Sequence, residues 1–138
     1  MKMKVQGFIQ SVKTSPWHYS IRLRHAGKTT FLLLPRGGKF NQVLVSEEEI
    51  PSHLRMNDKS REKLKNFSIG CFLKTVHLNN EGVYLELDCH HTEKFIFLIY
   101  IKGKLHLGYL EKGKLYMPYR SPSTYVKENV SSLSIIRK

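Results

Sequence analysis

The residues best suited to chemistry gather in one short segment. Residues 89–91 read Cys-His-His and Glu93 follows closely, and all three side-chain types are zinc ligands. Adjacent residues of a strand point to opposite faces, so Cys89 and His91 could converge on a metal ion but His90 could not join them. His77 would have to supply a further ligand from a neighbouring strand. The sequence has neither a CxxC nor an HxxxH spacing, and we therefore expect no metal site and no cofactor.

Spacings that support hydrolysis or group transfer are also missing. The chain has no GxSxG, no HExxH and no paired-carboxylate motif. Its acidic run, residues 47–49, is more typical of a solvated helix start than of a catalytic site. The loop 36–39 (RGGK) could present backbone amides and cations to a phosphate, but it lacks the GxxxxGK[ST] spacing, so a plain basic turn stays equally open. We expect no catalytic residues and no enzymatic activity.

Charge is the strongest functional signal in the chain. Its 138 residues contain 23 Lys and Arg against 11 Asp and Glu, a net charge of +12. A surface this basic repels itself unless a polyanion neutralises it, and nucleic acid is the commonest such partner. Aromatic residues are interleaved with the basic ones, which suits RNA because cations hold phosphates and rings stack on unpaired bases. The alternative for each ring is a place in the core.

We predict that phosphate contacts come from two groups of basic residues. The first group comprises Arg22, Arg24 and Lys28 of one hairpin with Arg36 and Lys39 of the following loop. The second comprises Lys102, Lys104, Lys112 and Lys114, which flank later turns. Phosphate contacts position a nucleic acid without reading its sequence.

The elements that must carry these residues are mostly β-strands. Residues 19–24 alternate strictly, with Tyr19, Ile21 and Leu23 on one face and polar residues on the other, the pattern of a half-buried strand. Turn residues then recur about every ten residues, the spacing of an antiparallel sandwich or barrel. One helix is expected near residues 59–68, capped by Asn57 or Asp58. The predicted fold is mainly β, an antiparallel β-sandwich or barrel with this one short helix.

The boundaries of the strands and of the domain follow from the positions of these turns. The expected strands are 5–12, 19–24, 29–34, 42–45, 71–78, 83–89, 94–101, 104–111 and 114–117. Together they make a single β-rich domain over residues 1–120. Residues 121–138 are polar and contain Pro122, so we expect an extension that is either docked or mobile.

The two cysteines and the hydropathy pattern bear on the compartment. Cys71 and Cys89 lie in apolar, strand-like segments, and a disulfide framework would need more cysteines. We expect both to be core or half-buried thiols. No apolar run approaches the roughly 18–20 residues that a membrane span requires. The expected location is the cytoplasm, without a membrane partner.

Taken in order, several segments resemble the N-terminal domain of the NFACT proteins, once described as fibronectin-binding proteins. Residues 4–10 look like the first strand of that domain, and 19–24, a glycine turn and 30–34 look like its next hairpin. Residues 43–47 followed by Pro51 are similar to its strand, acidic turn and proline. Residues 61–70 (REKLKNFSIG) fall where the family has its "LLRKHLxGxRI" helix, and 83–87 and 97–107 look like the following strands. The resemblance covers residues 4–117.

This resemblance implies a β-sandwich related to the N-terminal domain of formamidopyrimidine-type DNA glycosylases, and a ribosome- or tRNA-associated role in quality control of stalled translation. The family's Asp-Arg pair would fall where this chain has Asn80 and Glu81, so no functional residue is carried over. Glycosylase chemistry needs Pro-Glu after the initiator, where this chain has Lys2 and Met3, and that activity is rejected.

The sequence therefore predicts a non-catalytic RNA- or ribosome-binding module that uses a basic β surface. The alternative is a protein-interaction module whose basic face binds an acidic partner protein. An enzyme of unrecognised type is a third class, which the absence of catalytic motifs disfavours. The oligomeric state is left open.

Overall fold

The structure is a computed structural model, and it describes residues 2–36, 43–78, 82–101 and 104–116. Lys39, Lys102 and the extension 121–138 lie outside these ranges, as does the domain boundary expected at residue 120. The side chains of residues 100, 101, 104 and 105 are likewise outside the description.

The described strands form one ten-stranded antiparallel sheet. They are β1 (Lys2–Met3), β2 (Gly7–Thr14), β3 (His18–His25), β4 (Lys28–Pro35), β5 (Leu44–Ser46), β6 (Phe72–Leu78), β7 (Gly82–Cys89), β8 (Thr92–Ile101), β9 (Lys104–Glu111) and β10 (Lys114–Tyr116). The order across the sheet is β10-β9-β8-β7-β6-β2-β3-β4-β5, and β1 also pairs with β6. Most neighbours in the sheet are therefore neighbours in sequence, as in an antiparallel meander.

Tight two-residue turns join several of these strands. His25 pairs with Lys28 across the turn formed by Ala26 and Gly27, and both turn residues have positive φ, 52° and 76°. This is the backbone geometry whose twist matches that of a hairpin. Glycine adopts it without steric cost, which explains why the sequence has Gly27 there.

The helix α1 (Lys59–Ser68) begins where the sequence predicted. Asp58 is its N-cap, and one carboxylate oxygen accepts a hydrogen bond from the backbone N–H of Arg61 at 2.8 Å. That bond satisfies one of the N–H groups that the first helical turn leaves unpaired. Leu64 is fully buried, so the helix presents an apolar side to the sheet.

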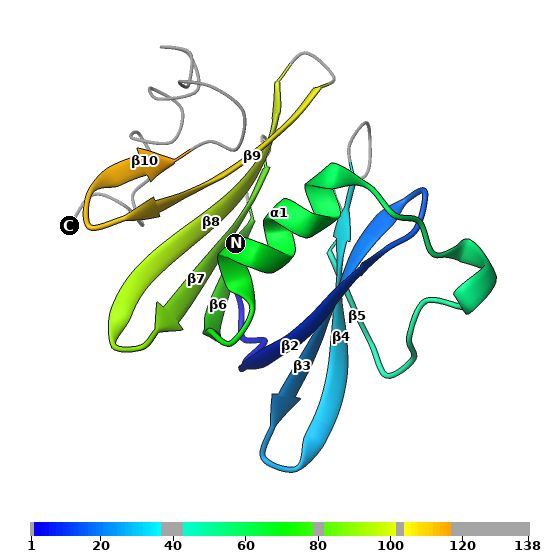
Figure 1. Cartoon of the computed structure of the whole chain (residues 1–138). Coiled ribbons are helices and arrows are strands. Elements are labelled where there is room, and N and C mark those ends of the chain that lie inside the picture. The colour runs from blue at the N-terminus through cyan, green and yellow to red at the C-terminus, as the bar shows by residue number, and fades with distance from the viewer. Residues whose placement is uncertain (1, 37–42, 79–81, 102–103, 117–138) are drawn as a thin grey trace.

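The sheet curves around α1. The helix contacts both β2 and β9, although β6, β7 and β8 lie between those strands in the sheet. On one side the Arg61 guanidinium donates to the Val12 carbonyl of β2 at 3.4 Å. On the other, the Phe67 ring meets Tyr109 of β9 edge-on, with centroids 4.7 Å apart. Figure 1 shows α1 lying across the sheet between the β2–β5 and β6–β10 groups of strands.

The main hydrophobic cluster lies on the face of the sheet that is turned towards α1, which we call the inner face. Tyr19, Ile21 and Leu23 of β3 are fully buried there, with Leu73 of β6 and Leu64 of the helix. The alternation in residues 19–24 predicted which side of β3 is buried. The mainly β, antiparallel fold with one short helix is confirmed.

The acidic run after β5 differs from the prediction. Residues 47–49 do not start a helix, and the next helical turn is a 3-10 helix at Ser52–Leu54. The Ser46 hydroxyl accepts a hydrogen bond from the Glu48 N–H at 3.0 Å, a local bond that competes with helical pairing. Pro51 also disfavours helical backbone at the residue before it.

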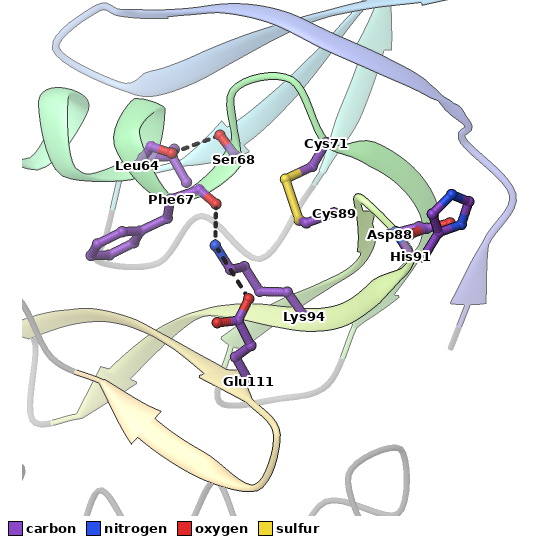
Figure 2. Close-up of a disulfide and its surroundings, with 9 residues drawn as sticks. All are labelled: Leu64, Phe67, Ser68, Cys71, Asp88, Cys89, His91, Lys94 and Glu111. Atoms are coloured by element: carbon purple, nitrogen blue, oxygen red, sulfur yellow. Dashed lines mark hydrogen bonds and ion pairs between the residues drawn. A yellow bond between two sulfur atoms is a disulfide. The ribbon is translucent and has the colours of Figure 1, made fainter.

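The two cysteines are not thiols, which corrects the prediction. Cys71 and Cys89 form a disulfide with a Cα–Cα distance of 4.5 Å, and it links the start of β6 to the end of β7 (Figure 2). Phe72 pairs with Asp88 in the register of these strands, so the residues one step outward lie opposite each other. The sequence pattern gave no register, and so it could not place the two sulfur atoms together.

Membrane association of the helical kind finds no support in the described ranges. No helix there has both the length and the apolar character that crossing a bilayer requires.

Candidate nucleic-acid interface

Two of the predicted arginines project from the face of the sheet opposite α1, which we call the outer face. Arg22 and Arg24 alternate along β3 with Ile21 and Leu23, which point into the core. Because successive residues of a strand point to opposite sides, both guanidinium groups leave the sheet on the same side. Both residues are exposed, and a strand paired on each side holds them in place.

Neither arginine has an acidic partner among the described residues. The Arg24 guanidinium donates to the Thr29 hydroxyl of β4 at 2.7 Å, which fixes its direction without neutralising its charge. No described carboxylate lies within ion-pair distance of Arg22 or Arg24. Their charge is therefore available to an anion from outside the molecule.

An exposed aromatic ring stands beside these arginines. Phe8 of β2 pairs directly with Arg24 of β3, and directly opposed residues share a face. Its side chain is 56% exposed. The Phe72 ring meets it at a 73° interplanar angle, with centroids 4.9 Å apart, and His25 contacts Phe72 in turn at 5.5 Å. We call the surface made by Phe8, Arg22 and Arg24 the arginine face.

Sequence reasoning missed Phe8. Only the β2–β3 register places it beside Arg24, and a register shift between Ile9 and Ser11 breaks the simple alternation along β2. One feature of the sequence indicates it: Phe8 is an apolar residue next to Gly7, on the side of the strand that is otherwise polar.

Lys28 is exposed but paired. Its ammonium group lies 3.6 Å from a carboxylate oxygen of Glu47, and both side chains are well exposed, so solvent screens the attraction. Lys13 on β2 pairs with Glu49 at 3.2 Å. The acidic run therefore neutralises Lys28 and Lys13.

Arg36 lies in an internal network instead of on an open surface. It forms an ion pair with Asp58, donates to the Ser15 carbonyl at 3.1 Å, and lies over the Tyr19 ring at 5.3 Å from the centroid. Its side chain is 23% exposed. These contacts tie the end of β4 to the start of α1, so we assign Arg36 a structural role.

The carboxyl group of Asp58 is the centre of this network. Burial alone would raise its pKa. Hydrogen bonds from the Ser60 hydroxyl and the Arg61 N–H, with the charges of Arg36 and Arg61, outweigh burial and lower the pKa below its ordinary value. The Tyr19 hydroxyl donates to Ser60 at 2.6 Å, and burial raises the pKa of Tyr19. Asp58 is thus held ionised by the groups it orders.

Lys114, from the second predicted group, emerges on the opposite face of the sheet from Arg22 and Arg24. Lys114 pairs with Glu111, Glu111 pairs with Lys94, and Lys94 pairs with Leu87, which is part of the core on the inner face. Because paired residues share a face, Lys114 emerges on the side of α1. Lys112 is exposed in the turn before β10 and Lys104 begins β9. Lys114 therefore does not form one continuous patch with Arg22 and Arg24.

A cluster of rings accompanies the second group. Tyr109 and Tyr116 are stacked with centroids 4.6 Å apart, and the Lys94 ammonium lies 4.5 Å from the Tyr109 centroid. Lys94 also donates to the Phe67 carbonyl at 3.0 Å and reaches Glu111 at 4.0 Å (Figure 2). These contacts hold the C-terminal turn of α1 against the sheet, so we assign Lys94 a structural role.

The aromatic residues that are interleaved with the basic ones in the sequence lie in different parts of the structure. Tyr19 is core, Trp17 is exposed in the β2–β3 turn, and Tyr109 and Tyr116 lie beside α1. Phe40 and Tyr119 fall outside the described residues, as does the side chain of Tyr100.

The cysteine and histidine segment has a structural account. Cys89 is bound to Cys71, so it cannot ligate a metal in this form. His90 and His91 form a two-residue turn with positive φ, and the His91 N–H donates to Asp88 at 2.9 Å. In the described part of the chain, no three His, Cys, Asp or Glu residues are placed to hold a metal ion.

No protein-family model matches the chain, and no curated protein matches it in sequence.

Proposed function

We propose that the chain is a non-catalytic RNA-binding module that contacts RNA through the arginine face. The observation that carries this proposal is the pair of exposed arginines on β3, which have no described acidic partner and share a face with an exposed ring. Guanidinium groups bind phosphate with several donors in a fixed fork. An aromatic ring beside them favours nucleic acid over an acidic protein, because bases stack on rings and carboxylates do not.

The chain's overall charge supports the same partner. A net charge of +12 attracts a polyanion over distances larger than any single contact, and it speeds encounter at low salt. The natural partners that fit are ribosomal RNA and tRNA, in line with the expected link to translation quality control. The resemblance of residues 4–117 to the NFACT N-terminal domain belongs to this proposal.

The proposed location in the cytoplasm conflicts with one feature of the structure. Disulfides persist in oxidising compartments and are rare where thiols are kept reduced. A cytoplasmic RNA-binding chain would therefore contain Cys71 and Cys89 as thiols for much of its life. The redox state of Cys71 and Cys89 in freshly prepared cell extract distinguishes a reducing compartment, where both are thiols, from an oxidising one, where the disulfide persists.

Direct binding with a charge-matched competitor tests the function. Fluorescence anisotropy of a labelled RNA 20-mer is measured against the purified chain, and unlabelled RNA or poly-glutamate is added at equal concentrations of negative charge. We expect RNA to compete and poly-glutamate to compete at least tenfold less well. Equal competition would contradict the proposal and support the acidic-protein alternative.

A further inference from the structure

We propose that the RNA on the arginine face is single-stranded, with one unpaired base stacked on the Phe8 ring and adjacent phosphates held by Arg22 and Arg24. This inference rests on the proposed function and specifies the class of RNA. It starts from the position of Phe8, which is 56% exposed and pairs directly with Arg24 on the outer face.

The ring is held in a fixed place. Phe8 lies on a strand that is paired with β3 on one side and with Phe72 of β6 on the other. Phe72 contacts it edge-to-face at 4.9 Å, and His25 supports Phe72 from the next hairpin. A ring fixed in this way has already lost the freedom that stacking would otherwise remove, and such preorganisation favours binding.

The two arginines have a spacing that suits an extended strand of RNA. They are two residues apart on one face of β3, a separation of about 7 Å along the strand. Successive phosphates of an extended single strand are separated by a comparable distance. Phe8 lies opposite Arg24 on the neighbouring strand, to the side of the two arginines. A base likewise lies to the side of the phosphate backbone that carries it.

Charge also sets the side on which the phosphates run. Phe72 pairs with Asp88 on β7, and Asp88 pairs with Glu93 on β8. The Asp88 carboxylate therefore lies at the border of the outer face beyond the two phenylalanines, where it repels phosphate. The backbone is therefore favoured over β3, and the base is directed inwards to Phe8.

A duplex does not fit this arrangement. In double-stranded RNA the base faces are stacked inside the helix, and the exposed contacts are phosphates and 2′-hydroxyls. Phe8 would then meet only the polar backbone, because no base face is available to it. The ring contributes to binding only when the base is unpaired.

The test compares an A-rich single-stranded 20-mer with an RNA duplex of 20 base pairs, by anisotropy under the same salt. The variants are Phe8→Leu, which keeps an apolar side chain and removes the ring, and Phe8→Tyr, which keeps the ring. We expect Phe8→Leu to weaken single-strand binding about tenfold, Phe8→Tyr to bind as the parent does, and duplex binding to be unchanged by either. Circular dichroism checks that each variant folds.

A spectroscopic variant detects the stacking directly. The chain has a single tryptophan, so Phe8→Trp combined with Trp17→Phe places the only indole on the arginine face. Stacking on a base should quench its fluorescence when single-stranded RNA is added, and the duplex should leave it unchanged.

The outcomes separate the two proposals. Equal binding of both RNA forms overturns this inference and leaves the RNA-binding function standing. The same holds if single-strand binding depends on Arg22 and Arg24 but Phe8→Leu does not weaken it. If neither RNA form binds, both are overturned. Weaker single-strand binding by Phe8→Leu with indole quenching supports the inference.

Discussion

Arg36 at the end of β4 and Asp58 at the start of α1 form an ion pair that joins two segments 22 positions apart in sequence. The same carboxylate caps the helix through the Arg61 N–H. One side chain therefore fixes both where α1 begins and how the end of β4 lies against it.

Replacing Asp58 should separate these two roles. Asp58→Ala removes the cap and leaves the Arg36 guanidinium without its carboxylate, and we expect a loss of about 1–3 kcal/mol in the free energy of unfolding. Asp58→Ser retains a capping oxygen and should lose less. Urea denaturation of the three proteins measures this, and equal stability of Asp58→Ala and the parent would contradict the role.

Acid should weaken the fold through the same group. The pKa of Asp58 is lowered in the folded chain from its ordinary value of 3.8, so the unfolded chain takes up its proton first as pH falls. The stabilisation is complete above about pH 4 and is lost as pH drops through the folded pKa. The Asp58→Asn variant has no carboxyl group to protonate at this position, so the loss of stability below pH 4 that Asp58 causes should be absent from it. Thermal unfolding at pH 2–6 compares the two proteins, and superimposable profiles would refute this prediction.

The disulfide gives a prediction about chemical state and stability. Cys71 and Cys89 are 18 positions apart, and closing a loop of that size stabilises a fold by about 3 kcal/mol in the chain-entropy account. Protein purified under oxidising conditions should take up no alkylating agent until it is reduced, and the reduced form should unfold at lower urea concentration. Intact mass spectrometry after alkylation tests this directly, and two alkylated cysteines before reduction would show that the bond is absent.

Gly82 should tolerate no side chain. A Cβ at this position would meet the Leu98 carbonyl oxygen and would lie 3.0 Å from the Ile99 Cα of the neighbouring strand. Because backbone cannot move aside as a side-chain end can, Gly82→Ala should cost about 1–3 kcal/mol. Gly27→Ala is the control. Its added Cβ has nothing within 4 Å, so any loss of stability there comes from the positive φ alone. A smaller loss at Gly82 than at Gly27 would be inconsistent with the packing described.

The sequence was informative where a single segment carried the whole signal. The alternation in residues 19–24 predicted that Arg22 and Arg24 face away from the core, and the capping residue and apolar spacing predicted the helix at Lys59–Ser68. Contacts between distant segments could not be obtained in this way. The partner of Arg36, the pairing of Phe8 with Arg24, and the placement of Lys114 on the opposite face from Arg22 all depend on register and sheet order, which local patterns do not specify.

The most direct test of the central claim reverses charge on one face at a time. Arg22→Glu with Arg24→Glu changes the arginine face, and Lys112→Glu with Lys114→Glu makes the same change of net charge elsewhere. RNA affinity is measured by anisotropy for the parent and both variants across a series of salt concentrations. We predict that the arginine variant binds much more weakly and that its log–log salt dependence is shallower by about 1.4, the change expected for two lost contacts to a single strand. The lysine variant should retain the parent's slope. Equal losses and equal slopes in the two variants would mean that net charge alone governs binding, and would contradict the assignment of the arginine face.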